Sequence, residues 1–292
     1  MLHNILSLRD PTSLYQAWYN AIAKPYSTRK LTYMPDTLPA ISGLARHFAR
    51  LTNDQYVAGL WRRDLLHGVF WVLRHPPHDS LASLAGSIIH PPLYIAPSWS
   101  WAGRGQISFF LQGRRDLLSR LSTQRAQLEC DDLWAYATPT GYDEFGAVSE
   151  GSLTLETRVC PLAPGRYVWV PQIADTHIGD FHLERPDQPT KTFSCYLDWE
   201  QRVTGTDVWA RDIIMALVGS VKKDLSGESN NTSRNSPMLA EPFGLLLYPT
   251  PVAAHYIRVG LFGPTARRLG DNQERLRLGD FMSYTKQSVT IM

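Results

Sequence analysis

The sequence has few cysteines, and none of them are arranged as metal ligands or redox pairs. The three that occur, Cys130, Cys160 and Cys195, are far apart, without a CxxC pair or a Cys/His spacing typical of zinc. We therefore expect no metal. The odd number of cysteines and an N-terminus unlike a secretory signal predict a reducing compartment, so we expect a cytoplasmic protein.

Long hydrophobic runs and a surplus of one charge are also missing. The longest apolar runs, 68–73 and 213–218, are too short to span a bilayer. The chain has 29 basic and 27 acidic residues, a formal net charge of +2. A nucleic-acid-binding protein usually concentrates basic residues in one patch. We therefore expect neither a membrane span nor a nucleic-acid partner.

Sequence motifs that indicate a cofactor or a covalent nucleophile are absent as well. The sequence contains no Gly-rich phosphate-binding loop and no GxSxG nucleophile motif. Cys195 lies in an apolar run, where a thiol usually behaves as a small hydrophobic side chain. We therefore expect no cofactor.

Helical patterns occupy the first quarter of the chain. Leu14, Trp18 and Ile22 recur at steps of four, which predicts a helix that starts near residue 12 and ends at Pro25. Apolar residues at helical spacing predict a second helix over 38–51 and a third over 54–73.

Strand-like patterns follow a proline-rich connection at 74–78. The clearest covers 151–159, where apolar and polar residues alternate. Further strands are predicted over 106–111, 166–170, 193–199, 243–248, 256–262 and 289–292. Residues 212–221 fit either a helix or a strand. We expect an α+β protein in which N-terminal helices (1–75) pack on an antiparallel β-rich body (76–292), a barrel or a sandwich, with a flexible loop near 226–237.

One polar cluster has the composition of a catalytic site. Residues 175–184 contain two histidines and three acids, and on a strand Asp180 and His182 would face the same side. With His177 nearby, they are candidates for acid/base catalysis, because histidine titrates near neutrality. The alternative, which we favour, is a polar hairpin exposed to water, since the spacing matches no strong metal motif.

Residues 97–102 read Pro-Ser-Trp-Ser-Trp-Ala, and two interpretations fit them. In an extended segment, Trp99 and Trp101 would share one face, with the two serines opposite. The indoles then form either core that fixes the helices to the β-rich body, which we favour, or the wall of a ligand pocket. Trp99, Trp101 and Tyr94 are therefore the pocket candidates.

Several blocks occur in the order found in a known family. Residues 26–32, 36–45, 56–61 and 97–102 resemble successive landmarks of fungal heterokaryon-incompatibility (HET) domain proteins, and 256–262 and 289–291 resemble that family's closing strands. The resemblance runs over most of the chain. In that family the landmarks follow an α/β effector segment similar to TIR-type domains, and we expect this protein to lack that segment.

The resemblance implies an intracellular fungal protein that lacks the effector segment and acts in non-self recognition or as an interaction module for a protein partner. A second hypothesis is a cofactor-independent enzyme, a cyclase or isomerase, that holds an apolar metabolite against tryptophan walls. A third is a metal-dependent hydrolase at His177 and His182.

Overall fold

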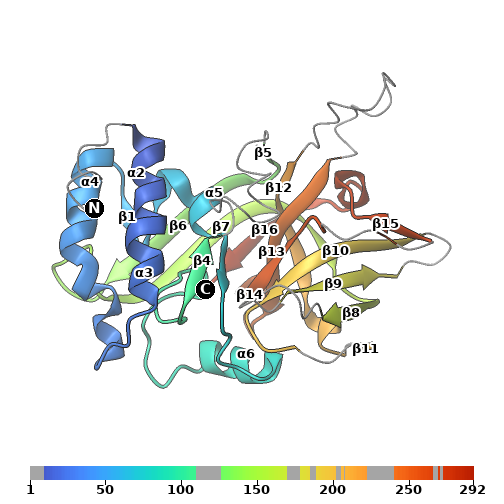
Figure 1. Cartoon of the computed structure of the whole chain (residues 1–292), viewed down its shortest axis with the longest axis horizontal. Coiled ribbons are helices and arrows are strands. Elements are labelled where there is room, and N and C mark those ends of the chain that lie inside the picture. The colour runs from blue at the N-terminus through green and yellow to red at the C-terminus, as the bar shows by residue number, and fades with distance from the viewer. Residues whose placement is uncertain are drawn as a thin grey trace.

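The computed structural model describes residues 10–109, 126–169, 178–184, 189–201, 205–206, 208–221, 240–265, 269 and 272–292. Helices gather at one end of the molecule and a large sheet extends away from them (Figure 1). The predicted α+β class is confirmed. The predicted loop at 226–237 lies outside the described residues.

The first helical segment is longer than predicted. It runs through α2 (Pro11–Ala17), the π-helical turn η1 (Trp18–Ala23) and α3 (Lys24–Ser27), so Pro25 does not end it. Asp10 caps it by accepting the N–H of Ser13 at 2.8 Å. Pro25 is tolerated because it lies in the first turn of α3.

The second predicted helix is confirmed and the third is wrong. After η2 (Met34–Thr37), the turn η3 (Pro39–Ile41) leads into α4 (Ser42–Thr52). Residues 54–73 instead form β1 (Tyr56–Val57), β2 (Leu60–Trp61), η4 (Arg62–Asp64), α5 (Leu65–Gly68) and β3 (Trp71–Leu73).

A tight turn explains why this stretch is not a long helix. Ala58 and Gly59, between β1 and β2, have φ angles of 45° and 97°, which a right-handed helix does not allow. The apolar side chains around the turn are buried although they do not lie on one helix face, and their spacing happens to match that of an amphipathic helix.

Twelve strands of the described residues share one sheet. Its main path runs β11-β8-β9-β10-β14-β13-β12-β7-β16, with β15 on β10, β5 on β12 and β6 on β7. The strands are β5 (Ala126–Leu128), β6 (Asp131–Pro139), β7 (Val148–Pro161), β8 (Gly165–Trp169), β9 (Ile178–Leu183), β10 (Thr190–Leu197), β11 (Gly205–Thr206), β12 (Ile214–Val221), β13 (Glu241–Pro249), β14 (His255–Gly263), β15 (Gln273–Arg275) and β16 (Lys286–Ile291).

Most of the predicted strands are therefore found, but their arrangement differs from the expectation. Pairing is antiparallel except for β10 with β15 and β14 with β16. The sheet is mixed and does not close into a barrel, and its strands belong to one continuous sheet rather than to two separate ones. The predicted strand at 106–111 is the short β4 (Ile107–Phe109), which pairs with β3 outside that sheet.

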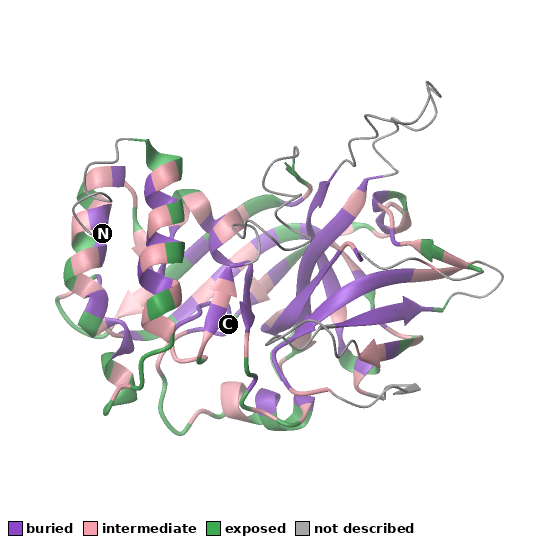
Figure 2. Cartoon of the chain, viewed as in Figure 1, coloured by how far each residue is buried: buried purple, intermediate pink, exposed green. Residues whose placement is uncertain are grey.

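The central strands are buried on both faces, as Figure 2 shows by their purple colour. In β12, Ala216 and Val218 belong to the core that includes the N-terminal helices, whereas Met215 and Leu217 belong to a second core. A strand covered on both faces reads as a continuous apolar run, which is why the sequence of β12 fitted a helix equally well.

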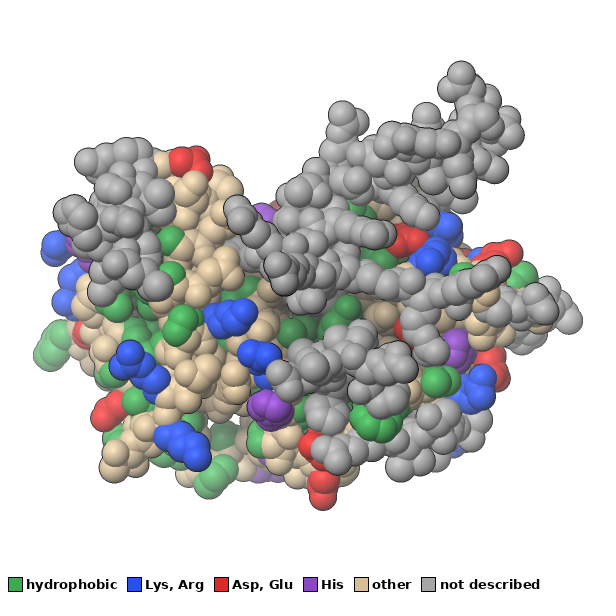
Figure 3. All heavy atoms as spheres, in the orientation of Figure 1, with side chains coloured by type: hydrophobic (Ala, Val, Ile, Leu, Met, Phe, Trp, Pro, Cys, Tyr) green, Lys and Arg blue, Asp and Glu red, His purple; other side chains and the backbone are tan. Residues whose placement is uncertain are grey.

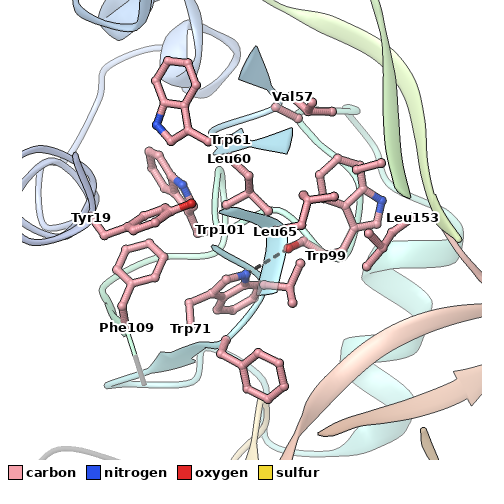
Figure 4. Close-up of a cluster of buried hydrophobic side chains, with 14 of the residues drawn as sticks. Tyr19, Val57, Leu60, Trp61, Leu65, Trp71, Trp99, Trp101, Phe109 and Leu153 are labelled. Carbon is pink, nitrogen blue, oxygen red and sulfur yellow. Dashed lines mark hydrogen bonds between the residues drawn. The ribbon is translucent and has the colours of Figure 1, made fainter. Parts of the chain in front are cut away.

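The Pro-Ser-Trp-Ser-Trp-Ala segment joins the helical end of the molecule to the sheet. It is a turn rather than a strand. The indole of Trp101 donates to the Gly59 carbonyl at 3.0 Å, and that oxygen also accepts the indole N–H of Trp18 at 3.0 Å. Figure 4 shows the packed rings and the bond from the Trp71 indole to the Trp99 carbonyl, 3.0 Å long.

The serines of the segment are as deeply engaged as the tryptophans. The Ser100 hydroxyl donates to the Ala58 carbonyl at 2.5 Å. The Ser98 hydroxyl donates to the main-chain oxygen of Met292 and accepts the N–H of Arg258 at 3.0 Å. All four side chains of 98–101 are buried, in agreement with the favoured interpretation that these indoles belong to the core.

Close packing of this segment against β7 gives a stability prediction. A Cβ at Gly151 would lie 2.6 Å from Cγ of Pro97 and 2.8 Å from the Tyr136 carbonyl oxygen, whereas a Cβ at Gly86 would meet nothing within 4 Å. We expect Gly151→Ala to lower the free energy of unfolding by about 1–3 kcal/mol. The control Gly86→Ala, in a helix, should raise it by about 0.5–1 kcal/mol. Denaturant unfolding measures both, and equal stability of the two variants would contradict this packing.

Candidate functional site

A pocket of about 500 Å³ opens where three parts of the chain meet. They are α6 (Leu81–Ile89), the irregular segment 91–104, and the start of β14 with the turn before it. Its apolar lining comes chiefly from Leu73, Pro77, Leu84, Ile88, Ile89, Pro91, Leu93, Ile95, Pro97 and Ile257. This size and this apolar character are typical of small-molecule sites.

The helix α6 was not predicted, and it forms one wall of the pocket. Ser80 caps it by accepting the N–H of Ser83 at 3.3 Å. Leu81 and Ala85 anchor the helix in the second core. Its next turn then presents Ser87 and Ile88 to the pocket.

The most deeply buried polar group of the pocket is an ion pair. Arg258 on β14 donates through Nη1 to Oδ2 of Asp198 at 2.7 Å, and the two side chains are 0% and 5% exposed. The same guanidinium donates through Nη2 to the Trp71 carbonyl and lies 3.4 Å from the centroid of the Trp71 ring. Its charge is therefore compensated by a carboxylate, a carbonyl and an aromatic face.

Burial shifts the pKa values of both partners toward their neutral forms. Loss of solvation lowers the pKa of Arg258 to about 10 and raises the pKa of Asp198. The attraction between the two opposes both shifts, and the short charge-assisted bond keeps them ionised at neutral pH.

Arg104 places a second guanidinium in the pocket lining. It is half-buried, and its side chain makes no hydrogen bond or ion pair with any residue in the described part of the chain. Burial lowers the pKa of Arg104, and the charge of Asp198 acts in the opposite direction. Arginine stays charged in proteins, so the pocket holds a cation without a bound partner.

Tyr94 and His78 lie near this cation. Burial chiefly raises the pKa of Tyr94 to about 12, so the phenol stays protonated and can donate a hydrogen bond. Burial first, and then the charge of Arg104, lower the pKa of His78, which is therefore neutral at neutral pH. Its two ring nitrogens lie 3.2 Å from the hydroxyls of Ser83 and Ser87.

Of the residues proposed from the sequence, only Tyr94 lines this pocket. Trp99 and Trp101 are 0% and 1% exposed, and both belong to the core rather than to the pocket lining. His177 lies outside the described residues.

Asp180 and His182 lie on β9, and neither lines the pocket. Ser194 donates to Oδ1 of Asp180 at 3.0 Å, and Nδ1 of His182 lies 2.9 Å from the Thr192 hydroxyl. Both side chains are buried, so the expected water-exposed hairpin is wrong for them. Their bonds to the neighbouring strand β10 satisfy buried polar groups within the sheet.

The charged residues of the pocket were missed, although two of them leave a trace in the sequence. Arg258 interrupts the apolar strand 256–262, and Asp198 stands between Leu197 and Trp199 at the end of β10. A charge inside an apolar strand is rarely buried alone, so each should have suggested a buried partner. Arg104, in a Gly-Arg-Gly turn, carries no such signal.

Comparison of the chain with protein-family models, with curated proteins and with solved structures finds no match. The resemblance to HET domain proteins therefore stays a prediction. Within the described ranges, no three His, Cys, Asp or Glu side chains gather closely enough to hold a metal ion. No described helix combines the length and the apolar character needed to cross a membrane. On the face in Figure 3, basic and acidic side chains are interspersed among the coloured atoms.

The buried ion pair gives a second stability prediction. Arg258→Met leaves the Asp198 carboxylate buried without its partner, so we expect the free energy of unfolding to fall by about 3–5 kcal/mol. The matched control is Arg46→Met, which removes a pair with Asp143 of similar length, 2.8 Å, but with side chains 46% and 40% exposed. That change should cost less than about 1 kcal/mol. Equal losses in denaturant unfolding would show that Arg258 is not the buried anchor described here.

Proposed function

We propose that the chain is a binding module whose pocket takes one small, largely apolar molecule. The observation that carries this proposal is the 500 Å³ pocket itself, in which apolar side chains from α6 and the segment 91–104 surround a few polar groups. Burial of a ligand against such walls supplies affinity, and the few polar groups fix its orientation. The expected interaction role of a HET-like protein agrees with a module that senses a small molecule.

Binding is favoured over turnover because neither of the titratable side chains beside Arg104, His78 and Tyr94, is a free proton acceptor at neutral pH. Both ring nitrogens of His78 face serine hydroxyls. Tyr94 has a pKa of about 12 and therefore stays protonated at neutral pH. A general base works best when its pKa lies near the operating pH. The hypothesis of a cyclase or isomerase also placed Trp99 and Trp101 in the pocket wall, and these indoles lie in the core.

A neutral probe tests the proposal without any contribution from charge. N-Phenyl-1-naphthylamine, which becomes fluorescent in apolar surroundings, should bind the full chain saturably at one site. Ile88→Trp places an indole in the pocket from α6. It should weaken this binding about tenfold or more, because the indole occupies the space in which the probe would make its apolar contacts.

The matched control lies on the same helix. Ala82 is exposed and does not line the pocket, so Ala82→Trp should leave the affinity for the probe unchanged. If the native protein gave no saturable fluorescence, or if the two tryptophan variants bound the probe equally well, the pocket would not be a binding site.

A further inference from the structure

The pocket lining contains one guanidinium that no residue of the described ranges pairs with directly. Arg258 is neutralised by Asp198, at 2.7 Å, whereas Arg104 has no hydrogen-bonding or ion-pairing partner in the described ranges. Because Arg104 is half-buried and lines the pocket, water solvates its guanidinium only in part. A cation in that position gains free energy from an anion that displaces the remaining water.

The other ionisable groups of the described lining do not pair with Arg104. Glu150 is exposed at the rim, and its carboxylate accepts the Thr138 hydroxyl at 3.0 Å. His78 is neutral at neutral pH, because burial and Arg104 lower its pKa. His255, whose Nδ1 lies 2.9 Å from the Ala253 carbonyl, adds no negative charge.

Tyr94 supplies a second donor near the same position. Its hydroxyl makes no hydrogen bond with a described residue, and the charge of Arg104 opposes the rise of the Tyr94 pKa. A guanidinium and a phenol together match a carboxylate, which has two oxygens and accepts several hydrogen bonds. A single unpaired guanidinium suits one negative charge, since a second anionic charge would be desolvated without a partner.

We propose that the ligand of this pocket is a monocarboxylate with a compact apolar body, whose carboxylate pairs with Arg104 while its body packs against α6. This inference rests on the proposed binding function and names the ligand class. The apolar part contacts Leu84 and Ile88, and the acid group lies toward Arg104 and Tyr94.

A pair of probes of nearly equal shape tests the assignment. Naphthalene-1-acetate and naphthalene-1-acetamide share one apolar body and differ in charge. Each is titrated against the full chain loaded with N-phenyl-1-naphthylamine, and its affinity is read from displacement of that fluorescent probe. We expect the acid to bind about tenfold or more tighter than the amide, because a hydrogen bond to a charged group is stronger than one to a neutral group.

Removal of Arg104 should abolish the preference and nothing else. In Arg104→Met the acid and the amide should bind equally, with the affinity for the amide and for N-phenyl-1-naphthylamine unchanged, which also shows that the pocket is intact. Arg104→Lys should retain part of the preference, because it keeps the charge but loses the planar fork. Arg62→Met is the control, since Arg62 lies over the ring of Trp134, at 3.8 Å, and does not line the pocket.

The outcomes separate this inference from the proposed function. If N-phenyl-1-naphthylamine binds but the acid has no advantage over the amide, or keeps its advantage in Arg104→Met, the assignment of the ligand class is overturned while the pocket stands. If N-phenyl-1-naphthylamine itself does not bind to the native chain, both proposals fail.

Discussion

A buried guanidinium connects the parts of this molecule. Arg258 extends from a central strand of the sheet, yet its partners come from elsewhere: the carboxylate of Asp198, the carbonyl and ring of Trp71, and the hydroxyl of Ser98 on its backbone N–H. Desolvating such a charge is costly unless each of these partners is in place. The strand β3, the turn at 97–102 and the end of β10 are therefore held in one relative position, and that position defines the inner end of the pocket.

The pocket follows from how the chain runs around this anchor. Prolines at 91, 92 and 97 limit the segment after α6 to extended and turn conformations, so it passes along the rim instead of filling the space with a helix. The large rings of Trp99 and Trp101 that follow pack into the hydrophobic core, where the Trp101 indole donates to the Gly59 carbonyl and the Trp99 carbonyl accepts the Trp71 indole N–H. What remains to line the pocket is mostly aliphatic side chains and prolines, together with a few polar groups that include Arg104, and this is the lining that the proposed apolar acid requires.

The sequence was informative where one local rule dominated, and misleading where a distant contact overrode it. Alternation at 151–159 predicted β7, and the apolar stripe at 38–51 predicted α4, because in each case one face of the element is buried. The prediction of a helix over 54–73 failed because hydrogen bonds from an indole and a hydroxyl fix the Ala58–Gly59 turn. These groups lie 41 and 42 residues away in the sequence. The residues of the site were harder to predict, and only Tyr94 was among the candidates. The partners of the charged side chains depend on the pairing of strands that are far apart in the chain.

A crystal structure of the full chain with naphthalene-1-acetate tests most directly whether this pocket binds an apolar acid through Arg104. We expect the naphthalene ring to lie against Leu84 and Ile88, and the carboxylate to lie within hydrogen-bonding distance of the Arg104 guanidinium. A ring bound elsewhere on the molecule, or a carboxylate that points to solvent while Arg104 turns away, would contradict it.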